Sequence, residues 1–179
     1  FTDASHASDP DTRRSIASVV VKLGGNTIYW RNHFTSIVSH SSTESELMAL
    51  DTGATLSEAM RWLLAALHGP SSEDQKDIQI YVDNAGTLQI ANNPIQPGRN
   101  VHVHAKFFYV RDLVYEGKVS TLKIGTEEQV ADVGCTYKGG PSYRKLRRLL
   151  MTCARIVHDE NQLPQWITAD QEKPGRTEQ

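Results

Sequence analysis

Short apolar runs separated by polar turns fill the first forty residues. Residues 16–23 are rich in valine, and Gly24-Gly25-Asn26 separates them from a second extended run at residues 27–30. A glycine-containing turn between two such runs is typical of a β-hairpin. A further extended run is predicted at residues 34–38, and Asp3 lies in another before the hairpin. The chain is therefore expected to open with an antiparallel meander.

Residues 41–67 carry the longest helical signal, with Thr43 and Glu46 spaced as a capping box. At about 100° per residue, a single stripe collects one acidic residue and eight small or apolar ones. These are Glu46, Ala49, Leu50, Gly53, Leu56, Met60, Leu63, Leu64 and Leu67. Glu44 projects from the opposite side. The pattern predicts that Glu46 faces a sheet, that Glu44 faces water, and that Gly53 lets the helix approach the strands closely.

Strands and helices alternate in the next part of the chain. The pattern predicts a strand at residues 78–82, helices at 85–92 and 104–116, a strand at 119–124, and a helix carrying Asp132 that Thr126 and Gln129 cap. Alternation of this kind after a meander predicts an α/β protein whose mixed sheet is covered on both faces.

The domain organisation follows from length and composition. The chain has 179 residues, of which 39% are hydrophobic and 22% charged, as expected for one globular domain. We expect the domain at residues 1–133, a connection with an amphipathic helix at 134–157, and a loosely ordered tail at 158–179. No apolar run approaches the ~20 residues that span a bilayer, so no membrane partner is expected. Because Phe1 is not an initiator methionine, we expect a piece of a longer polypeptide.

Charge and cysteine content narrow the functional classes. The net charge of −2 argues against a broad basic surface that would hold nucleic acid by charge alone. A basic cluster at residues 143–148 fits either a phosphate contact or an ordinary solvated helix face. Cys135 and Cys153 are predicted to be free thiols, since two cysteines form no disulfide framework.

Four carboxylates lie at positions where ligands converge in α/β proteins. Asp3 and Asp83 lie at or beside strand ends, Glu46 lies in the first turn of a helix, and Asp132 lies near the start of another. Clustered acids repel one another unless a cation is present, and hard oxygen ligands suit Mg²⁺ or Mn²⁺. Taken singly, each acid also fits a turn or helix cap.

The local contexts of these acids resemble those of a known enzyme family. They read Phe1-Thr2-Asp3-Ala4-Ser5, Ser41-Ser42-Thr43-Glu44-Ser45-Glu46, Tyr81-Val82-Asp83-Asn84 and Gln129-Val130-Ala131-Asp132. In this order they resemble the ribonuclease H domain that ends the polyprotein of copia-type retrotransposons, over roughly residues 1–133. The resemblance implies a ribonuclease H-like fold, with a mixed five-stranded sheet of three antiparallel strands followed by parallel strands, flanked by helices.

The resemblance also implies an activity. In that family the acids matching Asp3, Glu46, Asp83 and Asp132 bind two Mg²⁺ ions, with Mn²⁺ as a substitute, and hydrolyse the RNA strand of an RNA/DNA hybrid. Asn84 would lie beside the metals, while Arg13 and Arg14 would contact a phosphate or support a loop. The implied partners are the hybrid and a reverse transcriptase joined upstream. The implied location is a cytoplasmic retroelement particle, or the nucleus.

Two other hypotheses remain open. The chain could be a catalytically silent or domesticated ribonuclease H-like module that binds nucleic acid or a partner protein without cleavage. A related nuclease or integrase on the same fold fits less well, because its acids are fewer or differently spaced. Gly134-Cys135-Thr136 also stands where the family shows Thr-Lys.

Overall fold

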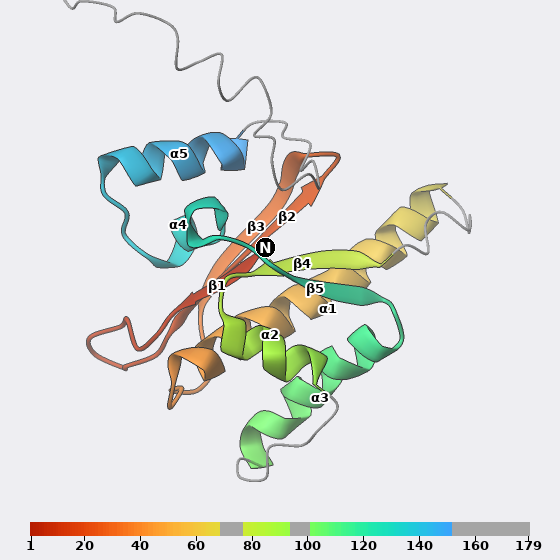
Figure 1. Cartoon of the computed structure of the whole chain (residues 1–179), viewed down its shortest axis with the longest axis horizontal. Helices are drawn as coiled ribbons and strands as arrows, with labels where there is room; N and C mark the ends of the chain where they lie inside the picture. Colours follow the sequence, from red (N-terminus) through yellow and green to blue (C-terminus); the bar gives the residue numbers. More distant parts are fainter. Residues whose placement is uncertain (69–76, 94–100, 152–179) are drawn as a thin grey trace, which may run out of the picture.

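The strands of the computed structural model form two hydrogen-bonded units (Figure 1). The structure describes residues 1–68, 77–93 and 101–151. The antiparallel unit has the order β1-β2-β3, and the parallel unit pairs β4 with β5. Their bounds are Thr2–Ser5 for β1, Ile16–Leu23 for β2, Asn26–Phe34 for β3, Ile78–Val82 for β4 and Val119–Lys123 for β5. The fold is α/β with three antiparallel strands and a parallel pair, as the sequence predicts.

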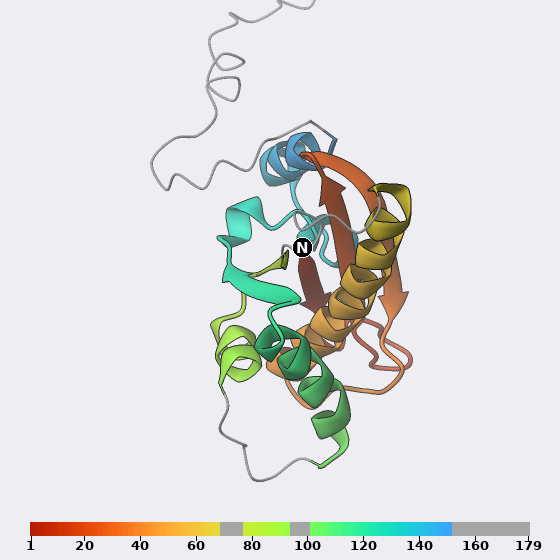
Figure 2. The same ribbon diagram turned by 90° about the vertical axis from the view of Figure 1, so that its right-hand side faces the viewer.

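Helices flank these strands, as Figure 2 shows from the side. They are α1 (Ser42–His68), α2 (Ala85–Asn92), α3 (Val101–Tyr115), the 3₁₀ helix η1 (Thr126–Glu128), α4 (Asp132–Cys135) and α5 (Gly140–Met151). Helix α1 contacts β1, β2 and β4, whereas α4 contacts all three strands of the antiparallel unit. No helix among the described residues is long and apolar enough to cross a membrane.

Alternation along β1 and β2 assigns the two faces of the antiparallel unit. Thr2 lies against Gly53 of α1, where an added Cβ would overlap the Thr2 methyl group. Asp3, the next residue, bonds to Cys135 of α4. Successive side chains of a strand point to opposite faces, so α1 and α4 cover opposite sides. The predicted reason for Gly53, a close approach of helix and sheet, is confirmed.

The buried apolar side chains form two clusters. The first joins α1, α2, α3 and the parallel pair through Leu50, Ala54, Ile80, Val82, Ala91, Val110, Leu113 and Val119. The second joins Val20 to Val130 and Ala131, with Phe1, Leu149 and Leu150 packed against them. Burying an aliphatic side chain contributes roughly 1.5–3 kcal/mol, so the first cluster is the main core.

A side-chain amide lies between the two strand units. Gln129 is fully buried, and its Nε2 donates to the carbonyl of Thr2 at 2.9 Å and that of Tyr81 at 3.4 Å. The rings of Phe1 and Tyr81 stack beside it, with centroids 4.8 Å apart. The sheet is therefore split at the β1–β4 boundary, where side-chain contacts take the place of a backbone ladder.

Two details of the predicted meander are wrong. The runs at residues 27–30 and 34–38 were expected to be separate strands, but β3 continues through Arg31, Asn32 and His33. The strand then ends at Phe34, so the rest of the second run is not extended in the sheet. Strand β2 is long enough to pair with Arg31, Asn32 and His33, so the polar sequence does not interrupt the ladder. Beyond β3 the hydroxyl of Thr35 bonds to the carbonyl of Ile37, closing a turn.

Helix α5 packs on the antiparallel unit as the predicted amphipathic helix. Leu146 is buried, and the last turn accepts hydrogen bonds from Lys22 Nζ and Thr27 Oγ1. The predicted end of this helix, beyond residue 151, and the tail at 158–179 lie outside the described residues.

Candidate metal centre

The start of α1 positions Glu46 and corrects the assignment of Glu44. Ser41 Oγ accepts the backbone N–H of Glu44 at 3.1 Å, and Glu44 Oε2 accepts the N–H of His40 at 2.6 Å. The capping box is thus Ser41 with Glu44, and not Thr43 with Glu46. Glu44 is only 8% exposed, so the expectation that it faces water is wrong. Its carboxylate folds back over the helix start because the first backbone N–H groups lack helical partners.

Glu46 lies on the sheet side of α1, as its periodicity predicts, and meets two other acids. Ligand oxygens of Asp3, Glu46 and Asp83 all lie within 4.8 Å of one another. The three residues come from β1, from the first turns of α1, and from the end of β4. Thr126 Oγ1 donates to Asp83 Oδ2 at 3.1 Å, and Lys123 Nζ donates to its carbonyl at 2.6 Å. These two contacts fix the otherwise exposed end of β4 beside the buried pair.

Burial makes this group electrostatically costly when it is fully ionised. Burial, together with the negative charges of Asp3 and Asp83, raises the pKa of Glu46 to about 9, although a hydrogen bond from the Ala4 backbone opposes the shift. Burial likewise raises the pKa of Asp3 to about 6, against the lowering effect of the Cys135 thiol. Such shifts indicate that the site stabilises a positive charge, whether a proton or a cation.

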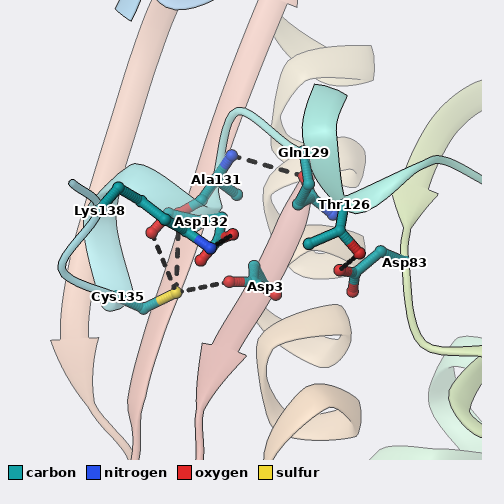
Figure 3. Close-up of polar contacts among 8 residues, drawn as sticks. All are labelled: Asp3, Asp83, Thr126, Gln129, Ala131, Asp132, Cys135 and Lys138. Atoms are coloured by element: carbon teal, nitrogen blue, oxygen red, sulfur yellow. Dashed lines mark hydrogen bonds and ion pairs between the residues drawn. The ribbon is translucent and has the colours of Figure 1, made fainter. Parts of the chain in front are cut away.

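Asp132 lies on the other side of Asp3 (Figure 3). It begins α4, as predicted, and it forms a second group with Asp3 and Cys135 whose ligand atoms also lie within 4.8 Å of one another. The Cys135 thiol donates to Asp3 Oδ2 at 2.6 Å, and Lys138 forms an ion pair with Asp132. Burial, together with the negative charge of Asp3, raises the pKa of the Cys135 thiol, so it stays protonated and acts as a donor. Asp3 therefore belongs to both groups.

The donor set fits divalent cations with hard-ligand preferences. Within the described ranges Glu46 Oε2 is buried and has no hydrogen-bond partner, although the residue is only 6% exposed. A buried carboxylate oxygen without a partner costs free energy that a cation would recover. Asp3, Glu46 and Asp83 offer only carboxylate oxygens, the ligands that Mg²⁺ and Mn²⁺ prefer.

The residues predicted to touch substrate have different positions in the structure. Asn84 follows Asp83 directly, and its side-chain oxygen caps α2 by accepting the N–H of Thr87 at 3.0 Å. Arg13 and Arg14 are exposed on the loop between β1 and β2, where Arg13 has a positive φ of 56°. The structure thus gathers the four acids, and it leaves the two arginines on a surface loop.

Four contacts of the site were missed or misassigned from the sequence. Thr126 and Gln129 were expected to cap the helix of Asp132, but the Thr126 side chain bonds to Asp83 instead. Gln129 Oε1 does accept the N–H of Ala131, just before α4, at 3.4 Å, while its Nε2 donates across the β1–β4 boundary. Cys135 follows Asp132 by three positions, a spacing that places both on one helix face. Lys138 lies beyond the end of α4, so no periodicity could have placed it near Asp132.

Helix α4 approaches the strands closely at Gly134. A Cβ there would overlap Ser18 Oγ and Asn32 Oδ1. Asp3, Ser18 and Asn32 lie opposite one another across β1, β2 and β3. Glycine at this position therefore lets the backbone of α4 carry Asp132 and Cys135 down to Asp3.

Comparison with known proteins finds sequence similarity over 74% of the chain. No protein-family model matches the sequence. The chain is 29% identical over 134 residues to the retrovirus-related Pol polyprotein from transposon TNT 1-94 of Nicotiana tabacum. It is 29% identical over 132 residues to that from transposon RE1 of Arabidopsis thaliana. A shorter match, 42% over 50 residues, covers 28% of this chain and 35% of the secreted RxLR effector protein 161 of Plasmopara viticola.

The two polyproteins are much longer than this chain, which covers 10% of the first and 9% of the second. The chain is thus similar, over 74% of its length, to retrovirus-related Pol polyproteins from plant transposons.

Proposed function

We propose that this chain is a metal-dependent endonuclease that hydrolyses the RNA strand of RNA/DNA hybrids, as one part of a retroelement Pol polyprotein. The observation that carries the proposal is the position of Asp3. Its carboxylate has ligand atoms within 4.8 Å of those of Glu46 and Asp83 on one side, and within 4.8 Å of that of Asp132 on the other. A carboxylate in this position can bind both members of a pair of cations ~4 Å apart.

Each acid has a role in this proposal. Asp3, Glu46 and Asp83 would hold one Mg²⁺ or Mn²⁺ ion, and Asp3 with Asp132 would hold a second. Two bound ions would supply an activated water and neutralise charge on the phosphate. Attack of that water on phosphorus breaks the bond to the 3′ oxygen, which leaves a 5′-phosphate and a 3′-hydroxyl end. The protein fixes the ligands beforehand through the Ala4 backbone at Glu46 and Thr126 at Asp83.

Two observations support an RNA/DNA hybrid as the substrate. The first is the similarity to Pol polyproteins, and the second is the presence of local basic groups on the surface. A retrovirus-related Pol polyprotein supports a role in reverse transcription, the process that makes RNA/DNA hybrids. Hybrids are recognised through backbone and 2′-hydroxyl contacts, which need local basic groups and not a broad basic face. Arg13 and Arg14 on their loop, Asn84 beside Asp83, and the basic face of α5 are the proposed contacts.

A labelled hybrid tests the proposal directly. We expect the protein to cleave the RNA strand in the presence of Mg²⁺ and to leave single-stranded RNA and duplex DNA intact. Excess EDTA should abolish the cleavage, and the same preparation of a Glu46→Gln variant should be inactive, which excludes a contaminating ribonuclease. Equal cleavage of single-stranded RNA, or full activity in EDTA, would contradict the proposal.

A catalytically silent module is the second candidate, and two contacts favour it. Lys138 pairs with Asp132, and the Cys135 thiol bonds to Asp3, so a cation that reaches Asp132 must compete with both groups. Under this alternative the protein binds hybrid in the presence or absence of Mg²⁺ but releases no product in either condition.

A further inference from the structure

Two large aromatic side chains lie exposed on β3, the outer strand of the antiparallel unit. Trp30 is 69% exposed and Phe34 is 53% exposed. Single apolar residues scattered over a surface are ordinary, but large rings gathered beside other binding groups mark an interaction site. The question is therefore what lies next to these two rings.

Pairing and alternation place both rings on the side of the sheet that α4 and α5 cover. Trp30 lies opposite Val20, which belongs to the cluster against which the last turn of α5 packs. Residues opposite each other in an antiparallel pair have their side chains on one face. Asn32, between the two aromatic residues, meets Gly134 of α4, so alternation puts Phe34 on this face as well.

Helix α5 brings positive charge to the same face. Its sequence contains no acidic residue, and its exposed side carries Arg144, Lys145, Arg147 and Arg148. The Thr27 hydroxyl of β3 bonds to the carbonyl of Leu150, which holds the end of α5 against the strand of the two rings. Lys145 forms an ion pair with Glu127 of η1 at 3.6 Å, and the helix still has a net positive charge. Aromatic rings and cations thus occupy one surface.

This combination of groups suits a single strand of nucleic acid. Basic side chains bind its phosphates, and an exposed ring stacks on a base of any identity. In a duplex the faces of the bases are covered by their neighbours, so a ring on a protein surface stacks on unpaired bases. The backbone of Trp30 is held in the ladder with β2, so little freedom is lost when its ring stacks.

We propose that this face, formed by Trp30, Phe34 and the cations of α5, binds single-stranded nucleic acid. Charge complementarity favours this occupant over an apolar protein surface, because covering the cations of α5 with apolar groups would cost free energy. Asn32 lies two strands away from Asp3, which at ~4.8 Å per strand puts the rings roughly 10 Å or more from the acids. The proposal goes beyond the nuclease activity and does not depend on it.

Binding of a labelled oligothymidylate in EDTA tests the proposal without any cleavage. A length of about 12 nucleotides is within the range of such sites. Trp30→Ala should weaken binding by about five- to 100-fold, the usual effect of removing one stacked ring, and Trp30→Phe should keep most of the affinity. Trp62→Ala is the matched control and should bind as the wild type does. Trp62 is 75% exposed, but it belongs to α1, which covers the opposite side of the sheet.

Two further measurements separate stacking from phosphate contacts. An abasic oligonucleotide of the same length and charge should bind the wild type as weakly as oligothymidylate binds Trp30→Ala. Arg147→Gln should lower the slope of log affinity against log salt concentration by roughly 0.7, the value for one phosphate contact on a single strand.

Unchanged binding by Trp30→Ala would overturn the proposal, and so would an equal loss in Trp62→Ala. Equal binding of the abasic oligonucleotide would also overturn it, because phosphate contacts alone would then account for the affinity. Self-association of the wild type that Trp30→Ala abolishes would identify a second copy of the chain as the occupant, against the proposal.

Discussion

Two glutamates of α1 that lie two positions apart have different partners. Glu44 closes the helix start, and Glu46 meets Asp3 and Asp83. Both are buried, so burial alone does not identify the one that acts in chemistry. The distinction lies in what each carboxylate faces: backbone N–H groups in one case and two other carboxylates in the other.

Substituting these residues separately should separate the two roles. Glu46→Gln should lower kcat on the hybrid by more than about 100-fold, because a direct ligand matters more than the groups that orient it. It should also raise stability in EDTA by relieving repulsion among the acids. Glu44→Gln should keep near wild-type activity and cost about 0.3–1 kcal/mol, since glutamine still caps but loses the charge at the helix start. Hybrid cleavage and urea unfolding measure both variants, and an inactive Glu44→Gln beside an active Glu46→Gln would refute the assignment.

Lys138 is expected to compete with a cation for Asp132. Lys138→Met should therefore lower the Mg²⁺ concentration at half-maximal thermal stabilisation by about two- to five-fold, the range of a partly exposed ion pair. Lys118→Met is the matched control, because Lys118 pairs with Glu116 elsewhere. If the Mg²⁺ concentration at half-maximal stabilisation rises or does not change in Lys138→Met, Lys138 does not obstruct the site.

At the scale of elements, Gln129 connects β1 to β4. Gln129→Leu keeps the volume but leaves the carbonyls of Thr2 and Tyr81 without their donor, so it should destabilise the fold by about 1–3 kcal/mol. Hydrogen exchange should rise first in β4. Thr126→Val, which removes a contact to Asp83 without touching the boundary, serves as the control. Loss of stability in the control alone would contradict the role given to Gln129.

The exposed basic face of α5 is expected to bind phosphates. Replacing Arg144, Lys145, Arg147 and Arg148 together should weaken hybrid binding and reduce its salt slope by roughly one for each lost contact, without changing single-turnover cleavage at saturation. Lys118→Gln, on the parallel pair side, should leave the slope unchanged. An unaltered slope in the fourfold variant would make this face an ordinary solvated surface.

Elements with strong periodicity could be predicted from the sequence, and contacts between elements could not. The strand at Ile78–Val82 and the helix at Ala85–Asn92 match their predictions, because burial repeats regularly along each. The capping box of α1 was misassigned because Ser41, Ser42 and Thr43 can all act as caps. The sequence also pointed to four acids, but the contacts of Cys135 and Lys138 depend on how α4 lies across the strands.

Across the whole molecule, removing divalent cations should make stability fall as pH rises. The pKa of Glu46 is about 9 in the folded state against an ordinary 4.5, and that of Asp3 is about 6 against 3.8. The folded protein thus holds more protons than the unfolded chain between these values, so the free energy of unfolding decreases through this range. This contribution to stability is fully present at pH values below the ordinary pKa values. It is lost at pH values above the raised pKa values.

Urea unfolding in EDTA at a series of pH values measures this dependence. Saturating Mg²⁺ should remove or reverse it, because carboxylate ligands must be ionised to bind a cation. Glu46→Gln should flatten the curve in EDTA, since it removes the group with the larger shift. Stability that increases with pH in EDTA over the same range would contradict the assigned electrostatics.

The split of the sheet gives the β1–β4 boundary a mechanical consequence. Asp3 belongs to the antiparallel unit and Asp83 to the end of the parallel unit, and the amide of Gln129 holds the two units together at this level. A rotation of one unit against the other would therefore change the separation of these two carboxylates. We therefore expect the ~4 Å spacing of the two proposed cations to depend on the contacts at this boundary, which are those of Gln129 and of Phe1 with Tyr81.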